Sequence, residues 1–225
     1  MRIVVIFMVF FALVLTGAAA MAQGTPAAGT QATKPTPTTA QDYFTQAREA
    51  FAKNDLDAAI FNGRMAISMK PDFLDAHYML GKAYLLRAAK ANRLAVRDYG
   101  MGSPQTRYLK QYVKGRSDLT KAIQQFEAAI ALSPKDIDAM LNLAIAQDNL
   151  GKEKEAIKTY EKTIELDPVG THARDAYSNM GLAYASLEKY KKAKASYEAA
   201  LKIDPTFTPA KLNLQRLMTL KPKLK

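Results

Sequence analysis

Apolar residues along this chain recur with a helical period, in short segments that follow one another. Within residues 174–207, small and apolar residues fall at i, i+3, i+4 and i+7, which places them on one face of a first helix: Tyr177, Met180, Gly181 and Tyr184. A tight turn at Glu188-Lys189-Tyr190 precedes a second helix. Strand-like alternation is absent from the pattern, which therefore predicts an all-α protein.

The same arrangement returns along the chain at a nearly fixed spacing. Four alanines are each followed by a proline twelve residues later: Ala59 and Pro71, Ala122 and Pro134, Ala156 and Pro168, and Ala193 and Pro205. Units of 34 residues that end two residues after each proline begin at Ala40, Leu74, Ile137, Arg174 and Thr208, at intervals of 34, 63, 37 and 34. A period of this size predicts a stacked helical solenoid.

These repeats resemble the tetratricopeptide repeat family from residue 40 to about residue 220. The resemblance rests on Leu80, Gly81, Tyr84, Ala122, Phe126, Ala129, Pro134 and their equivalents in other units. It implies a right-handed superhelical solenoid of helix-turn-helix repeats. We predict repeats at 40–73, 74–136, 137–170 and 174–207, followed by a C-terminal capping helix at 208–220.

The second unit is 29 residues longer than a 34-residue repeat (63 minus 34), and we predict a helical-hairpin insertion at 88–116. Apolar and small residues continue the first helix to the turn-forming residues Gly100–Pro104, and a second set marks a return path. The second helix of the repeat is expected to begin near Ser117, with Asp118 in its first turn. The pattern leaves open whether the hairpin projects, breaks at Gly115 or folds back across the solenoid.

This insertion is strongly basic. Its seven cations outnumber its single carboxylate, Asp98, so it contributes +6 of the chain's net charge of +11. The seven cations are Lys90, Arg93, Arg97, Arg107, Lys110, Lys114 and Arg116. Such a surface can bind an anionic lipid, an anionic polymer or an acidic protein. The alternative is that the cations only solvate the two helices.

The N-terminus predicts export. Met1-Arg2 precedes an apolar segment and the small residues Ala20-Met21-Ala22, the order of a secretory signal peptide at 1–22. An uncleaved N-terminal helix that anchors the chain in the membrane is the alternative. Residues 23–39 are polar and rich in threonine, alanine and proline, which predicts a disordered linker. We expect a periplasmic protein, for which nucleic acid is not an expected partner.

The family resemblance also implies a groove lined by the first helix of every unit, and such a groove suits a peptide or a helix with apolar anchors. The corresponding residues are Phe44, Arg48, Phe51, Tyr78, Lys82, Leu85, Leu141, Ile145, Asp148, Ser178 and Leu182. Packing of these side chains against neighbouring helices is the alternative. Phe44, Arg48 and Asp138 depart from the carboxylate-clamp pattern of the family, so that activity is not expected. Asp75, Asp138 and Asp175 are expected to stabilise helix N-termini.

No residue pattern predicts catalysis. The chain has no cysteine, and its two histidines, His77 and His172, have no partners at metal-ligand spacing in the sequence. We therefore expect no catalytic residue, metal or cofactor, and a non-catalytic protein-protein interaction scaffold of the bacterial envelope that binds a peptide or helix in its groove. The alternative is a peripheral envelope protein that binds an anionic partner through the insertion. The pattern does not identify the partner, the process or the oligomeric state.

Overall fold

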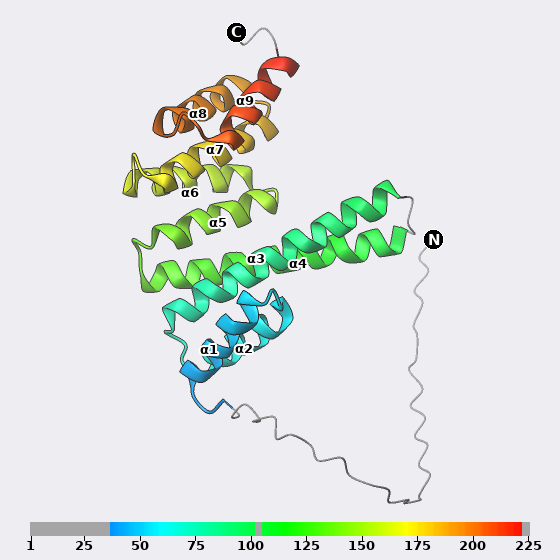
Figure 1. Ribbon diagram of the computed structural model, residues 1–225, viewed down its shortest axis with the longest axis vertical. Coiled ribbons are helices and arrows are strands. Elements are labelled where there is room, and N and C mark those ends of the chain that lie inside the picture. The colour runs from blue at the N-terminus through cyan, green and yellow to red at the C-terminus, as the bar shows by residue number, and fades with distance from the viewer. Residues whose placement is uncertain (1–36, 102–104, 222–225) are drawn as a thin grey trace, which may run out of the picture. The chain divides into compact units, whose positions relative to one another are not determined.

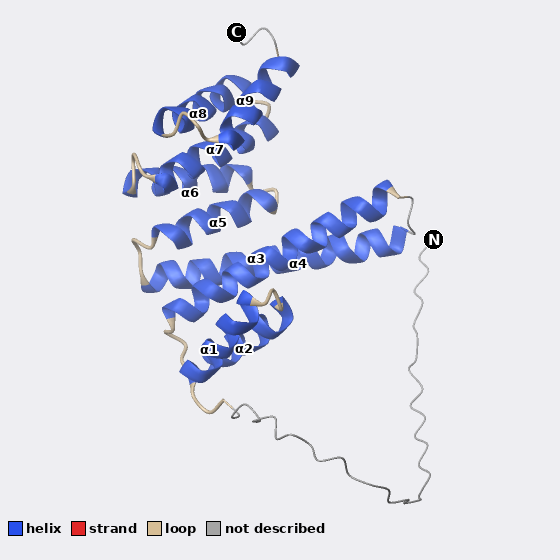
Figure 2. Cartoon of the chain, viewed as in Figure 1, coloured by secondary structure: helices blue, strands red, loops and turns tan. Residues whose placement is uncertain are grey.

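The structure, a computed structural model, describes residues 37–101 and 105–221, and every regular element in these residues is an α-helix (Figures 1 and 2). The predicted signal peptide and most of the predicted linker lie outside the described residues. The nine described helices are α1 (Ala40–Ala52), α2 (Leu56–Met69), α3 (Leu74–Gly100), α4 (Gln105–Leu132), α5 (Ile137–Asn149), α6 (Glu153–Leu166), α7 (Thr171–Ser186), α8 (Tyr190–Ile203) and α9 (Thr208–Leu220).

Within residues 37–221 the helices pack in chain order, each against the next, so that α1/α2, α3/α4, α5/α6 and α7/α8 form successive antiparallel pairs (Figure 1). The prediction of an all-α repeat protein is confirmed. None of the described helices is both long and apolar enough to cross a membrane. The handedness of the stack and the limits of the repeats stay predictions.

A small residue on the first helix of a pair faces an aromatic ring on the second. A Cβ atom at Gly81 would lie 2.7 Å from the Phe126 ring, and one at Gly181 would lie 2.4 Å from the Tyr197 ring. Both rings are almost fully buried. The first pair differs, because Gly63 stands where later units have the aromatic residue, and it packs against Met79 and Leu80 instead.

The turn inside each ordinary pair depends on one residue with positive φ. Asn54, Gly151 and Glu188 occupy the same position of their units, with φ values of 58°, 85° and 58°. Ala88 is the equivalent residue of the second unit, but it is helical, so the chain does not turn there. As a result α3 and α4 have 27 and 28 residues, whereas the other helices have 13 to 16.

The outer parts of α3 and α4, residues 88–100 and 105–116, are called the distal hairpin below. Figure 1 shows that they extend past the ends of the neighbouring helices. The helix α4 is unbroken at Gly115. This glycine instead allows close approach of the two helices, since a Cβ there would lie 2.3 Å from Oδ1 of Asn92.

Two predicted helix starts are wrong. The second helix of the long pair begins at Gln105 rather than near Ser117, because the return path is itself helical and α4 continues through Asp118. The helix α7 begins at Thr171, before Arg174, so Asp175 does not lie in its first turn and instead pairs with Arg174. The first turns of α3 and α5 do hold Asp75 and Asp138.

Candidate partner-binding surfaces

The first candidate surface is a hollow of about 440 Å³ formed by residues of α1 and α3. It brings together five of the predicted groove residues: Phe44, Arg48, Phe51, Tyr78 and Lys82. We call it the α1–α3 hollow. Ala52, Asp75 and Met79 complete its lining.

Cations lie over the aromatic rings of the α1–α3 hollow. The Lys82 Nζ atom is 5.2 Å from the Tyr78 ring centroid and 5.9 Å from that of Phe51. The Arg48 guanidinium is 5.9 Å from the Phe44 ring centroid. Such contacts hold the cations beside an apolar surface, where they can meet a carboxylate of a bound segment.

The other predicted groove residues have different environments. Leu85 and Ile145 are half-buried against the core, and Leu141 and Ser178 are buried. Leu182 is exposed. Asp148 is half-buried, and burial together with Glu153 raises its pKa to about 6. The predicted row is therefore accessible at its α1–α3 end through the half-buried Phe51 and Tyr78, although Phe44 there is buried, and it is largely filled by packing farther along.

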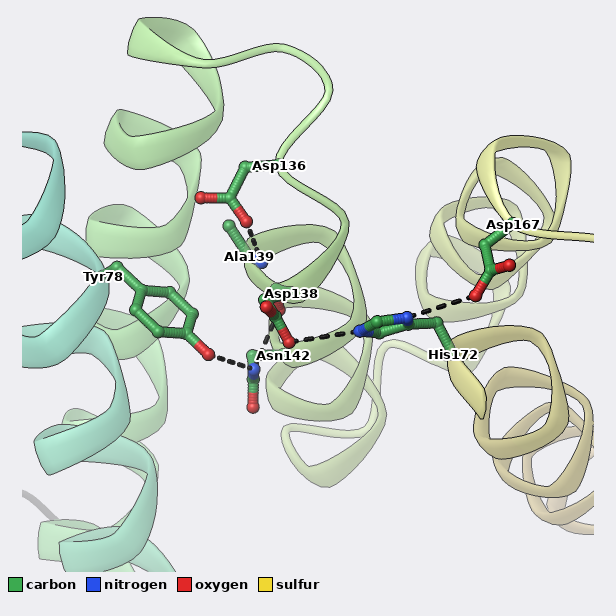
Figure 3. Close-up of polar contacts among 7 residues, drawn as sticks. All are labelled: Tyr78, Asp136, Asp138, Ala139, Asn142, Asp167 and His172. Carbon is green, nitrogen blue, oxygen red and sulfur yellow. Dashed lines mark hydrogen bonds and ion pairs between the residues drawn. The ribbon is translucent and has the colours of Figure 1, made fainter. Parts of the chain in front are cut away.

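A polar network joins three first helices beside this surface (Figure 3). The Asn142 amide donates to the Tyr78 hydroxyl at 3.4 Å and to the Asp138 carbonyl at 2.8 Å. His172 lies between Asp138 and Asp167, with each ring nitrogen 3.2 Å from a carboxylate oxygen. Burial alone would lower the pKa of His172, but the two carboxylates outweigh it and raise the pKa. The network thus joins neighbouring units to one another and helps to hold the stack together.

Tyr78 and His77 also serve packing. Burial is the main cause that raises the pKa of Tyr78 to about 12, and Asp138 and Asp136 add to it. The imidazole of His77 is buried, with its ring nitrogens 2.8 Å from Oε1 of Gln125 and 2.8 Å from the Pro71 carbonyl. Among the described residues, no three histidine, aspartate or glutamate side chains are grouped as metal ligands.

The second candidate surface lies on one side of the distal hairpin. Two hollows there share Leu94 and Gln111 and therefore adjoin. Five of the seven predicted basic residues line them: Lys90, Arg97, Arg107, Lys110 and Lys114. Arg93 and Arg116 line neither hollow. The cations thus form a defined cluster on both helices.

The opposite side of α4 is partly apolar. Leu109, Tyr112, Val113 and Arg116 are exposed and occur at i, i+3, i+4 and i+7 of the helix. Arg116 donates to the Leu150 carbonyl at 3.2 Å, so this side faces the third unit. The helical spacing of these residues was visible in the sequence, but their exposure was not.

An ion-pair cluster at the base of the distal hairpin was missed by sequence reasoning. Arg87 donates to both carboxylate oxygens of Asp118, at 2.9 and 2.8 Å, and also to Asp57. Asp118 is only 2% exposed. The pair joins α3 to α4 across 31 residues of sequence, a separation at which no local pattern links them.

Comparisons with known proteins identify the fold. Tetratricopeptide repeat family models match residues 115–179 and 175–207. The crystal structure of MamA protein is similar, with a TM-score of 0.61 and 21% identity, over 82% of this chain and 85% of that one. A thermophilic tetratricopeptide repeat protein from Thermus thermophilus is also similar, with a TM-score of 0.58 and 17% identity, over 81% of this chain and 83% of that one. No curated protein matches the chain.

Tetratricopeptide repeat proteins are non-catalytic scaffolds that generally mediate protein-protein interactions. The prediction that the chain is not an enzyme agrees with the family that the repeats indicate. The family models thus identify tetratricopeptide repeats within residues 115–207, and the solved structures share the all-α repeat fold of the described residues.

Proposed function

We propose that this protein is an interaction scaffold of the bacterial cell envelope that binds a peptide or a helix of a partner in the α1–α3 hollow. The observation that carries the proposal is the gathering of three aromatic rings and two cations in one open hollow. Aromatic rings supply apolar anchoring area, and Arg48 and Lys82 can pair with carboxylates of the bound segment. The signal-like N-terminus supports an envelope location.

Site-specific photo-crosslinking in the native envelope tests this function. The crosslinker replaces Ala52, which is exposed and lines the hollow, or Ala131, an exposed control alanine on α4. A discrete adduct from position 52 that disappears in the Lys82→Glu background supports groove binding. Equal adducts from both positions, or adducts insensitive to Lys82, contradict it.

A second candidate function belongs to the distal hairpin, which we interpret as an insertion into the second repeat. Five cations line two adjoining hollows there, and this clustering favours an anionic partner over simple solvation of the helices. Binding at the hairpin should weaken steeply with salt, whereas binding through the apolar anchors of the α1–α3 hollow should persist at moderate ionic strength. A titration at two salt concentrations separates the two.

A further inference from the structure

We propose that the two adjoining hollows of the distal hairpin form one binding trough for a ligand that carries several phosphate groups. The proposal rests on the second candidate function and specifies its ligand. Leu94 of α3 and Gln111 of α4 belong to both hollows, so the trough is continuous. Their volumes are about 250 and 490 Å³, large enough for a ligand of several phosphates.

The helices set the length of the trough. Lys90 and Arg97 are seven residues apart on α3, and Arg107 and Lys114 are seven residues apart on the antiparallel α4. At 1.5 Å per residue, each pair spans about 10 Å. Lys90 and Lys114 line the inner hollow, whereas Arg97 and Arg107 line the outer one. Each end of the trough is therefore lined by one cation from α3 and one from α4.

The carboxylates in the trough are already engaged. Asp55 accepts the Ala58 amide at 3.1 Å as the cap of α2, and Asp57 accepts from Arg87. Asp98, 2% exposed, accepts from Arg97 at 3.2 Å and fixes that guanidinium at the wall.

The remaining trough cations have no such partner. Within residues 37–101 and 105–221, no carboxylate forms a direct ion pair with Lys90, Arg107, Lys110 or Lys114. Asp57, whose pKa is lowered chiefly by its hydrogen bond from Arg87, also interacts at longer range with the charges of Lys114 and Lys90. The mutual repulsion of these cations is a cost that an anionic ligand would relieve.

Charge density distinguishes a phosphate ligand from an acidic peptide. Besides Arg97, which pairs with Asp98, four cations lie along about 10 Å, or one per roughly 2.5 Å of trough. An extended peptide advances about 3.4 Å per residue and turns alternate side chains away, so it offers the trough one carboxylate per roughly 7 Å. A chain of phosphates carries its charges much closer together, and the two guanidiniums can each bind phosphate oxygens with two hydrogen bonds.

Matched double variants test the trough. Lys110→Gln/Lys114→Gln removes two cations from the trough, and Arg93→Gln/Arg116→Gln removes two from the same hairpin outside it. Each double variant lowers the net charge from +11 to +9, by two unit charges. Calorimetric titration with short-chain inorganic polyphosphate is measured for both variants and the unmodified chain, after circular dichroism confirms that all three are folded.

The trough double variant should bind polyphosphate roughly tenfold or more weakly, since each charge-assisted hydrogen bond is worth about a factor of ten. The control double variant should change the affinity by less than about threefold, through the long-range field alone. Equal weakening in both variants overturns the trough while leaving a diffuse anionic surface, and so the second candidate function, in place. Poly-glutamate binding as tight as polyphosphate overturns the assignment to phosphate.

Vesicles identify the source of the phosphate. Phosphatidylcholine vesicles with and without phosphatidylglycerol are sedimented with each variant. Capture only by the anionic vesicles, lost in the trough variant, supports the trough with lipid headgroups as the source, whereas polyphosphate binding without capture supports it with a free ligand. If the unmodified chain binds neither probe, both the trough and the second candidate function are overturned.

Discussion

Arg87 holds the buried carboxylate of Asp118 with two parallel hydrogen bonds, at the point where α3 and α4 extend beyond the stack. The Arg87 side chain is 18% exposed and that of Asp118 is 2% exposed. Asp118 corresponds in the repeat to Asp55, the cap of α2. In the second unit, Asp118 lies inside α4 rather than before a helix, and its carboxylate joins α4 to α3 instead of capping a helix.

Removing Arg87 alone should destabilise the protein more than removing both members of the pair. Arg87→Met leaves the buried Asp118 carboxylate without its partner and should cost about 3 kcal/mol of unfolding free energy. Asp118→Leu leaves Arg87 with Asp57 as a partner, and Arg87→Met/Asp118→Leu should cost less than Arg87→Met alone. Urea unfolding of the four proteins measures the coupling. The exposed pair Lys152–Glu155, at 3.0 Å, provides the control, for which breaking the pair should cost less than about 1 kcal/mol.

The distal hairpin should be removable. Deleting 88–116 and introducing Ser117→Gly places a glycine at the position where Asn54, Gly151 and Glu188 have positive φ, directly before Asp118. Because that turn restores a 34-residue unit, the shortened chain should stay helical and melt cooperatively, as followed by circular dichroism. Loss of helicity would show that the hairpin is needed for the stack to fold.

Asp148 should make stability depend on pH. Burial, with Glu153, raises its pKa to about 6 in the folded protein, above the unfolded value near 3.8. The folded state therefore holds the proton more tightly, and stability falls as pH rises from about 4 to about 6. Asp148→Asn should stabilise the protein by roughly 2–3 kcal/mol at pH 8 and by little at pH 4. Thermal melts at both pH values test this, and an equal effect of Asp148→Asn at pH 4 and pH 8 would contradict it.

A methyl group at Gly181 should disturb the packing of the fourth unit. Its carbon would lie 2.4 Å from the Tyr197 ring, so the ring or the helices must shift, at a cost of about 1–3 kcal/mol. Among the described residues, no atom beyond the adjoining backbone lies within 4 Å of the same position at Gly100, and Gly100→Ala should be neutral or slightly stabilising. Comparable changes of melting temperature in both variants would mean that the ring contact does not decide the outcome.

Export should remove the first 22 residues. We expect N-terminal sequencing of the protein from the envelope fraction to begin at Gln23, because Ala20-Met21-Ala22 has the small residues that signal peptidase requires. A chain recovered from the membrane with Met1 intact would instead favour the anchored alternative.

Periodicity was sufficient to predict the helical repeats, because small residues such as Gly81 and large ones such as Phe126 recur where helices must approach. The start of α4 was mispredicted for an equally local reason. Ser117-Asp118 resembles a helix N-terminus. When a helix continues through such residues, nothing in the local sequence distinguishes that case from a true helix start. Their role depends on Arg87, which only the antiparallel pairing of α3 and α4 brings close.

The candidate surfaces were predictable to different degrees. Family positions located the α1–α3 hollow, since Phe44 and Tyr78 occupy equivalent places in adjacent units. Phe44 is nevertheless as buried as Leu141, the same position of the third unit, so the accessible part of the hollow is formed by Phe51 and Tyr78. Which of these positions stays accessible depends on the neighbouring helices. The number of cations in the hairpin was evident from the sequence. Which of them face the trough depends on how α3 and α4 are rotated relative to each other, and the sequence does not show this.

One uninterrupted helix contributes to both candidate surfaces, with Lys82 in the α1–α3 hollow and Lys90 in the trough. Eight residues of helix separate these side chains by about 12 Å along its axis. A partner that joins an apolar anchor to a phosphorylated group by a short flexible linker could span that interval, and its second contact would form at an effective concentration in the millimolar range. Two weak contacts on one rigid helix would then give an avidity about 10²–10⁴ times that of either one.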